Sequence, residues 1–180
     1  MNGRLVAAYS LLYGVYMLAT ILVIIIVLFD QITKYFASLS LQDGQAVTLI
    51  PRLISLRYHE NAGAAWGILS DKRWIFMIVS TVAIIAIIAF MIYTKKQAQS
   101  KLLTVSLSFF LGGGIGNMID RIRLEYVIDF LRFDFFEFPI FNVADSFISV
   151  GAGLMVLYLV LDTIREEKEK RNLKKERQNV

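Results

Sequence analysis

The sequence predicts an all-α polytopic membrane protein with four transmembrane helices. Of its 180 residues, 57% are hydrophobic and the mean hydropathy is +0.59, which is too apolar for a soluble domain. The apolar residues are concentrated in four long runs. Each run reaches the roughly 18 to 20 residues that a helix needs to cross about 30 Å of hydrocarbon. Composition and run length together therefore place the chain in a membrane.

The four runs define the expected helices in order. They are Leu5–Phe29, Trp74–Tyr93, Leu102–Ile119 and Phe138–Leu161, the last interrupted only by Asp145. The third run contains the glycines of "GGGIG", which lower helix propensity but are frequent where membrane helices pack closely. The first run is too long for the apolar core of a signal peptide, and no small-residue cleavage site follows promptly. We therefore expect it to be an uncleaved span.

Basic residues lie mostly on one side of the expected bundle. Four spans place both termini on the same side, together with the connection 94–101, and these segments hold 11 of the 19 Lys and Arg residues. The positive-inside rule places this side in the cytoplasm. We expect one domain, residues 1–164, followed by a charged cytoplasmic tail, residues 165–180. The net charge of +4 suits the anionic inner leaflet, and nucleic acid is a poor second interpretation.

The two outward loops, about 37–72 and 120–139, are expected to form a small extracytoplasmic sheet. "DQITKYFASL" continues the first helix beyond its apolar run, and residues 54–58 then alternate between apolar and polar side chains, as in a half-buried strand. "NAGAAWG" indicates a turn, and its Trp66 suits an interfacial anchor. The second loop, "EYVIDFLRFDFFEFP", is aromatic and β-branched, which favours a strand or an interfacial segment.

The chemistry available to the chain is limited, because it has no cysteine and a single histidine. The absence of cysteine excludes a thiol nucleophile, a disulfide and a Cys-ligated metal. His59 lies in "YHENAG", which lacks the second histidine of the HExxH zinc motif and is more typical of a surface residue. Acid–base chemistry therefore falls mainly to carboxylates, and we expect neither a metal nor a cofactor.

Charged and amide residues gather near the outward ends of the expected helices. A charged residue at a helix centre costs roughly 2.5 to 3.5 kcal/mol and normally faces the bundle interior, which makes it a functional candidate. Asp145 comes seven positions after Phe138, so we expect it about two turns into the fourth run. The other candidates are Asp30, Lys34, Asn61, Asn117, Asp120, Arg121, Asp129 and Asn142.

Each candidate also has a purely structural interpretation. Asp145 could pair with Arg121 or Lys34 and hold two helices in register. Asp30 lies four positions before Lys34 on one helix face, which favours a structural ion pair. Asp120 and its neighbour Arg121 could form a polar helix end, and the asparagines could cap helices or bridge them.

A catalytic interpretation requires Asp129 and Asp145 to converge. Like-charge repulsion would then raise the pKa of one acid, leaving one protonated and one ionised. Such a pair can activate a water for attack on a peptide carbonyl. Spacing alone also leaves open a proton-coupled transporter or channel, although no internal repeat is visible, and a structural membrane adaptor.

Five sequence blocks resemble the lipoprotein signal peptidases (signal peptidase II). In the family's order they are "DQITKYF" (30–36), "NAGAAWGIL" (61–69), "GGGIGNMIDR" (112–121), "YVIDFL" (126–131) and "FNVADSFISVG" (141–151). Each block is weakly specific alone, whereas five in order are specific. The resemblance implies an intramembrane aspartyl endopeptidase that cuts the signal peptide from diacylglyceryl-modified prolipoproteins, immediately before the lipidated cysteine.

The resemblance also implies roles for the candidates. Asp129 and Asp145 match the catalytic pair, and Asp30 and Lys34 match a stabilising pair. The positions that support the site or bind substrate are Asn61, Asn117, Asp120, Arg121 and Asn142. A small β-cradle, a short helix on the membrane surface, a monomer in the bacterial cytoplasmic membrane and a site near its outer face are further implications. The implied partners are the prolipoprotein and membrane lipid, without nucleic acid, cofactor or metal.

The chain departs from the family pattern at two places. Trp66 stands where Phe is commoner, and the segment before Asp30 is long, so that its first dozen residues could be an extension. Neither departure touches the proposed pair of acids.

Overall fold

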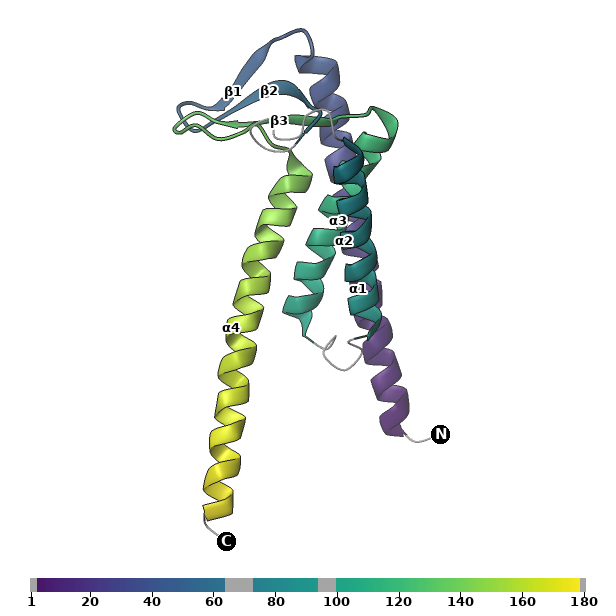
Figure 1. Cartoon of the computed structure of the whole chain (residues 1–180), viewed down its shortest axis with the longest axis vertical. Coiled ribbons are helices and arrows are strands. Elements are labelled where there is room, and N and C mark those ends of the chain that lie inside the picture. The colour runs from purple at the N-terminus through teal and green to yellow at the C-terminus, as the bar shows by residue number, and fades with distance from the viewer. Residues whose placement is uncertain (1–2, 64–72, 94–99, 179–180) are drawn as a thin grey trace.

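The computed structural model describes residues 3–63, 73–93 and 100–178. Its elements, in chain order, are α1 (Gly3–Leu41), β1 (Ala46–Ile50), β2 (Ile54–Asn61), α2 (Arg73–Tyr93), α3 (Lys101–Arg123), β3 (Val127–Phe133) and α4 (Val143–Gln178). Figure 1 shows the helices extending in one direction from a small sheet that lies across their upper ends, with both chain ends at the opposite end. This arrangement places the termini on one side, as four membrane crossings require.

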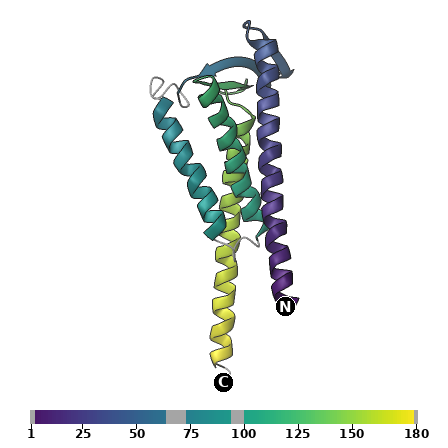
Figure 2. The ribbon, with the colours of Figure 1, turned by 90° about the vertical axis from the view of Figure 1, so that its right-hand side faces the viewer.

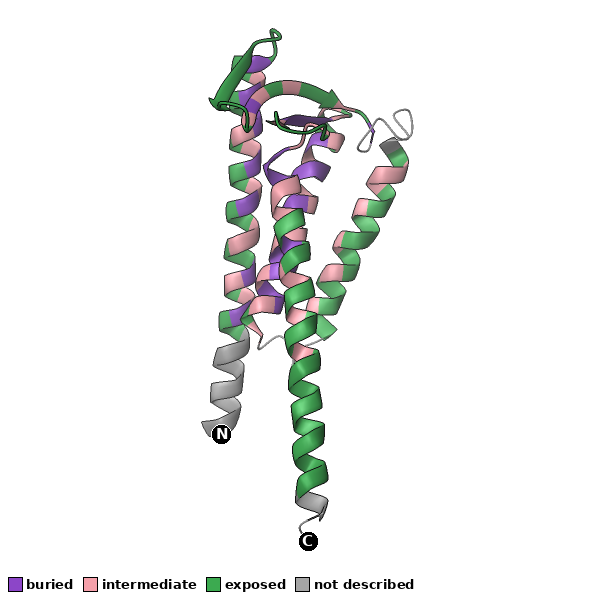
Figure 3. Cartoon of the chain, turned by 90° about the vertical axis from the view of Figure 1, so that its left-hand side faces the viewer, coloured by how far each residue is buried: buried purple, intermediate pink, exposed green. Residues whose placement is uncertain are grey.

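All four expected spans are helical. Within the described residues, four segments are long and apolar enough to cross a membrane: Tyr13–Leu41, Trp74–Tyr93, Lys101–Arg123 and Val143–Lys175. Exposed side chains follow the outward faces of α2 and α4, whereas α3 is the most buried of the four (Figure 3). Large apolar side chains on an outward face are typical of contact with lipid, so the burial pattern supports a membrane-spanning bundle.

Helix α3 is the centre of the bundle and contacts each of the other three helices. Figure 2 shows it between α2 and α1. A Cβ added at Gly113 would lie 2.5 Å from the carbonyl oxygen of Ala144, and one added at Gly116 would lie 2.5 Å from Oδ2 of Asp30. Only glycine fits at these two contacts, which confirms that the glycine run permits close helix packing.

The three strands form an antiparallel sheet in the order β1-β2-β3. Both strand predictions are confirmed, and the register pairs Ile54 with Phe133 and His59 with Asp129. The expected alternation is wrong at Ser55, a polar residue that is buried. Its hydroxyl donates a 2.8 Å hydrogen bond to Oδ1 of Asp134, and this bond compensates the lost hydration.

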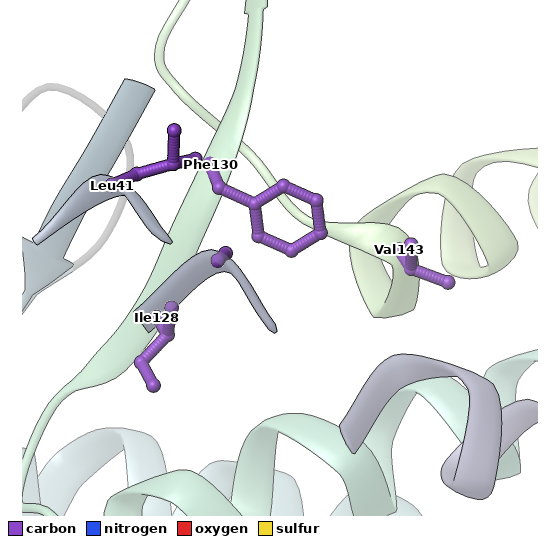
Figure 4. Packing of buried hydrophobic residues seen from close by; sticks show 5 residues of the cluster. Leu41, Ile128, Phe130 and Val143 are labelled. Atoms are coloured by element: carbon purple, nitrogen blue, oxygen red, sulfur yellow. The ribbon is translucent and has the colours of Figure 1, made fainter. Parts of the chain in front are cut away.

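A compact apolar cluster joins the sheet to the helices (Figure 4). It contains Ala37 and Leu41 from α1, Ile128 and Phe130 from β3, and Val143 at the start of α4. Burial of a large apolar side chain of this kind contributes about 1.5 to 3 kcal/mol. The cluster therefore holds the middle of β3 against α1 and the first turn of α4.

Helix α4 begins at Val143, so the expected start at Phe138 is wrong. Phe141 instead pairs with β3: its amide donates to the carbonyl of Leu131 at 3.0 Å, and its own carbonyl accepts from the amide of Leu131 at 2.8 Å. The apolar residues before Val143 therefore pack on the sheet in an extended conformation. Asp145 consequently lies in the first turn of α4, not two turns below its start.

Two remaining expectations concern the surface helix and the charged tail. Residues 64–72, which include Trp66, lie outside the described residues, and no helix besides α1 to α4 occurs in the described part. The expected surface helix therefore stays a prediction. The tail is helical as far as Gln178, and exposed ion pairs with i,i+4 spacing join Arg165 to Glu169 and Lys170 to Glu166.

Candidate active site

The structure joins all nine candidate residues into one hydrogen-bonded network where the helix ends meet the sheet. The contributing elements are α1, β2, α3, β3 and the first turn of α4 with the residue that precedes it. Every buried side-chain nitrogen or oxygen among the described residues has a hydrogen-bond partner. A buried polar cluster is stable only when its donors and acceptors are paired by hydrogen bonds, so the network is an integral part of the fold.

Asn142 lies at the centre of the network and is fully buried. It caps α4: its Oδ1 accepts from the amide of Asp145 at 2.9 Å, and Oδ2 of Asp145 accepts from the amide of Asn142 at 3.2 Å. This reciprocal pair is a capping box, which fixes both side chains. The Nδ2 group of Asn142 also donates to Oδ1 of Asp129 at 2.7 Å. One asparagine therefore contacts both Asp129 and Asp145.

The two acids differ in their surroundings. Asp129 has 1% of its surface exposed and accepts a second hydrogen bond from Nδ2 of Asn61 at 2.8 Å, whereas Asp145 is only partly buried. Burial, and after it the negative charge of Asp145, raises the pKa of Asp129 from 3.8 to about 7, against the hydrogen bonds from Asn61 and Asn142, which lower it. Burial is thus a larger cause than the like-charge repulsion that the sequence suggested.

Asp145 is joined to a buried cation through a second asparagine. Nδ2 of Asn117 donates to Oδ1 of Asp145 at 2.8 Å, and Oδ1 of Asn117 accepts from Nζ of Lys34 at 2.9 Å. Among the described residues, the ion pairs of Lys34 are with Asp30 at 2.9 Å and with Asp120 at 2.8 Å. The expected pair of Asp30 with Lys34 is therefore confirmed, and Lys34 reaches Asp145 only indirectly.

The acids that pair with Lys34 also hold the elements of the site together. Oδ1 of Asp30 accepts from the amide of Ala144 at 2.9 Å, which ties α1 to the N-terminus of α4. A carboxylate is favourable there because the first amides of a helix point out unpaired and carry partial positive charge. Oδ2 of Asp120 accepts from the amide of Ile128 at 3.2 Å, which ties α3 to β3. These bonds position the strand that carries one acid beside the helix that carries the other.

Arg121 contacts α2, whereas its sequence neighbour Asp120 pairs with Lys34. Its guanidinium lies 5.5 Å from the ring centre of Phe76 in α2, and its Nη1 donates a long hydrogen bond of 3.4 Å to the carbonyl of Asn117. Its positive charge acts on both Asp145 and Asp129. Asp120 and Arg121 therefore do more than form a shared polar helix end, because their side chains make direct contacts with different elements.

Sequence reasoning missed Gln31, which completes the buried cluster. Its Nε2 group donates to Oδ1 of Asp120 at 2.9 Å, to the carbonyl of Gly116 at 3.2 Å and to Oδ2 of Asp30 at 3.3 Å. A signal was available, because Gln31 follows Asp30 directly in a helix whose neighbouring residues are mostly apolar. The expected surface position of His59 is confirmed, since its side chain is exposed.

The fold and the site define a polytopic membrane protein whose buried polar network holds two acids beside one asparagine. The model of the signal peptidase (SPase) II family matches residues 22–161. The chain therefore belongs to the signal peptidase II family and is a membrane peptidase, which confirms the resemblance found in the sequence.

Individual relatives agree with this assignment. The lipoprotein signal peptidase of Brevibacillus brevis is 42% identical, and the match covers 77% of this chain and 91% of that protein. The lipoprotein signal peptidase of Shouchella clausii is 38% identical, and the match covers 86% of this chain and 100% of that protein. A solved bacterial membrane enzyme superposes with a TM-score of 0.74 at 35% identity, covering 81% of this chain and 88% of its own. Fold and sequence thus point to one family.

Proposed function

We propose that this chain is an aspartyl endopeptidase that removes the signal peptide from diacylglyceryl-modified prolipoproteins, cutting immediately before the lipidated cysteine. Asp129 and Asp145 are its catalytic pair. The observation that carries this assignment is the position of Asn142, which donates to one carboxylate and is joined by a reciprocal capping box to the other. The relatives named lipoprotein signal peptidase support the class of substrate.

The pair holds one proton before the reaction, on Asp129. Burial and the charge of Asp145 raise the pKa of Asp129 to about 7, so this acid is neutral at slightly acidic pH. Asp145 is less buried and accepts two N–H bonds, from Asn117 and from the amide of Asn142, which fix the position of its carboxyl group. The two acids therefore have opposite roles, set by their surroundings.

Hydrolysis then proceeds in two steps. The carboxylate of Asp145 takes a proton from a water whose oxygen bonds to the scissile carbonyl carbon, while Asp129 gives its proton to the carbonyl oxygen. In the resulting tetrahedral diol, Asp129 takes back a hydroxyl proton as the C–N bond breaks, and Asp145 gives its proton to the departing amine. Both acids return to their starting states, and neither step requires a metal or a cofactor.

The remaining candidates support this pair. Asn61, Asn117 and Asn142 orient the carboxylates through the hydrogen bonds described above, and the partly buried Asn61 can also contact substrate backbone. Arg121 contributes positive charge that stabilises the ionised acid. Asp30, Lys34 and Asp120 hold α1, α3, β3 and α4 in register, so we assign them a positioning role.

We further propose a location and an orientation. The chain works as a monomer in the bacterial cytoplasmic membrane, with residues 1–164 as one protease domain and residues 165–180 as a cytoplasmic tail. Both termini are cytoplasmic, because the tail and the connection 94–101 carry most of the basic charge. The site then lies near the outer face, with the diacylglyceryl chains of the substrate left in the surrounding lipid.

The experiment that tests the catalytic pair uses two conservative variants. Asp129→Asn and Asp145→Asn, each purified in detergent and given a lipidated precursor, are expected to lose cleavage while retaining the helical signal in circular dichroism. Asp43→Asn, an exposed carboxylate in the turn after α1, is the matched control and is expected to cleave normally. Cleavage at the wild-type rate by either site variant would exclude the assignment.

A further inference from the structure

A cluster of partly exposed aromatic rings lies where β3 leaves the sheet toward α4. We call the cluster the aromatic tip; its members are Phe133, Phe135, Phe136, Phe138 and Phe141. Their ring centres are 4.6 to 5.7 Å apart in seven contacts. The three outer rings are nevertheless exposed, with 58% of Phe135, 47% of Phe136 and 44% of Phe138 accessible. The rings therefore pack on one another and leave a broad apolar surface uncovered.

The turn between β1 and β2 extends this surface. Ile50 and Leu53 are both exposed, and Leu53 lies beside the aromatic tip because its carbonyl accepts from the amide of Asp134 at 3.1 Å. The neighbouring residue, Ile54, pairs with Phe133 across the sheet. Figure 1 shows both loops at the left end of the sheet, projecting past the start of α4. Two segments distant in sequence thus form one apolar patch.

The patch is held in a defined conformation by Asp134. Its Oδ1 accepts from the hydroxyl of the buried Ser55 at 2.8 Å and lies 3.7 Å from Nε of Arg132. With the bond to Leu53, these contacts fix the loop at three points. An ordered and exposed apolar patch of this kind marks an interaction surface.

Lipid is the partner that fits this surface. The patch lies at the end of the membrane-spanning bundle, because the sheet crosses the helix ends there and the chain passes from Phe138 and Phe141 into α4 at Val143 (Figure 1). Exposed Arg52 can meet a lipid phosphate, whereas the charge of Arg132 is balanced by Asp134 and an exposed Glu137 lies among the rings, so the attraction comes mainly from the apolar side chains. The apolar face of an amphipathic segment on a membrane lies about 5 to 10 Å into the boundary between headgroups and acyl chains.

We propose that the aromatic tip inserts into the leaflet nearest the sheet, which is the outer leaflet in the orientation proposed above. Insertion anchors the sheet to the bilayer surface and is independent of the catalytic roles of the two acids. The anchor also has a consequence for the site. Asp129 lies on the same strand, four residues before Phe133, or about 13 Å at the usual rise of a strand. A fixed depth of the tip therefore fixes the depth of that acid.

The chain is well suited to a direct test, because it contains no cysteine and a single introduced thiol can be labelled uniquely. Phe135→Cys and Phe136→Cys are each labelled with a nitroxide and reconstituted into vesicles of phosphatidylcholine and phosphatidylglycerol. Collisions with oxygen, which concentrates in lipid, are compared with collisions with a water-soluble nickel chelate. Val156→Cys, on an exposed position of α4, provides the lipid reference, and Asp43→Cys provides the water reference.

Labels at positions 135 and 136 are expected to collide more with oxygen than with nickel, as at Val156, whereas the order is reversed at Asp43. Collision with nickel at the level of Asp43 would overturn the inference. Shielding from both reagents would also overturn it, because it would indicate that protein covers the tip. Circular dichroism and cleavage of a lipidated precursor identify labelled variants that remain folded, and loss of cleavage alone leaves the depth measurement valid.

Discussion

Replacing Asp129 by asparagine is expected to change how stability depends on pH. Burial, and after it the charge of Asp145, raises the pKa of this acid from 3.8 to about 7 in the folded protein. The folded state therefore binds more protons than the unfolded state between these values. Wild-type stability must fall as the pH rises through this window, because ionising Asp129 costs more in the folded protein. A neutral asparagine has no such cost.

The size of the effect follows from the two pKa values. Linkage gives a cost to the folded state of about 2 kcal/mol at pH 5 and about 4 kcal/mol at pH 8, a difference of about 2 to 3 kcal/mol. Asn61 and Asn142 both donate to the carboxylate of Asp129, and an asparagine there has only one side-chain oxygen to accept. The substitution therefore disturbs one hydrogen bond, which costs about 1 to 3 kcal/mol. That loss does not depend on pH, so the difference between the two pH values isolates the charge.

Thermal unfolding in detergent micelles, followed by circular dichroism, measures this difference. For a chain of this length about 1 kcal/mol corresponds to roughly 2 to 4 °C in Tm, so the Asp129→Asn variant should gain about 5 to 10 °C on wild type between pH 5 and pH 8. Asp43→Asn, at an exposed position, serves as the baseline and should gain nothing. An equal Tm offset of the site variant at both pH values would refute the reasoning.

Three further outcomes are expected. Cleavage of a lipidated precursor should decline as the pH rises through about 7, because Asp129 then loses the proton that polarises the carbonyl; a flat pH–rate profile across this value would contradict its role as the acid. Lys34→Met leaves two buried carboxylates without their cation and should destabilise the folded protein by about 3 to 5 kcal/mol. Lys170→Met removes an exposed pair with Glu166 and should cost less than about 1 kcal/mol. Equal Tm values for the two variants would contradict the importance of burial. Gly116→Ala forces α1 and α3 apart and should lower Tm, while Gly114→Ala, whose added Cβ would lie 3.7 Å from Ile84, should not; the reverse order would show that close approach at Gly116 is unnecessary.

The spans and two of the three strands, β2 and β3, could be predicted because each depends on a local pattern. A run of apolar residues long enough to cross the bilayer indicates a helix whatever lies beside it, and alternation at residues 54–58 indicated β2. The start of α4 could not be predicted in this way. Phe138 and Phe141 are as apolar as the helix that follows them, and hydropathy does not distinguish a side chain that contacts lipid from one that packs on a sheet.

The candidate polar residues could be found in the sequence because ionisable and amide groups near apolar runs are few and each must have a purpose. Their grouping could not be found there. Lys34 had several possible partners within reach of a helical bundle, and Gln31, although a polar residue beside Asp30, had no partner that the sequence could identify. Spacing also could not show that Asp129 and Asp145 would contact one common asparagine, and it was the resemblance that paired them.

By itself, the sequence determined a four-span membrane protein, two strands outside it and a short set of polar residues that any function had to use. The tertiary structure alone decided which of these residues meet. The amide of Asn61 reaches Asp129 across 68 positions, and Asp30 accepts from Ala144 across 114. The first contact depends on the pairing of β2 with β3, and the second on how closely α1, α3 and α4 approach one another, which the absence of side chains at Gly113 and Gly116 permits. No local pattern specifies that geometry, because it results from the packing of all these helices together.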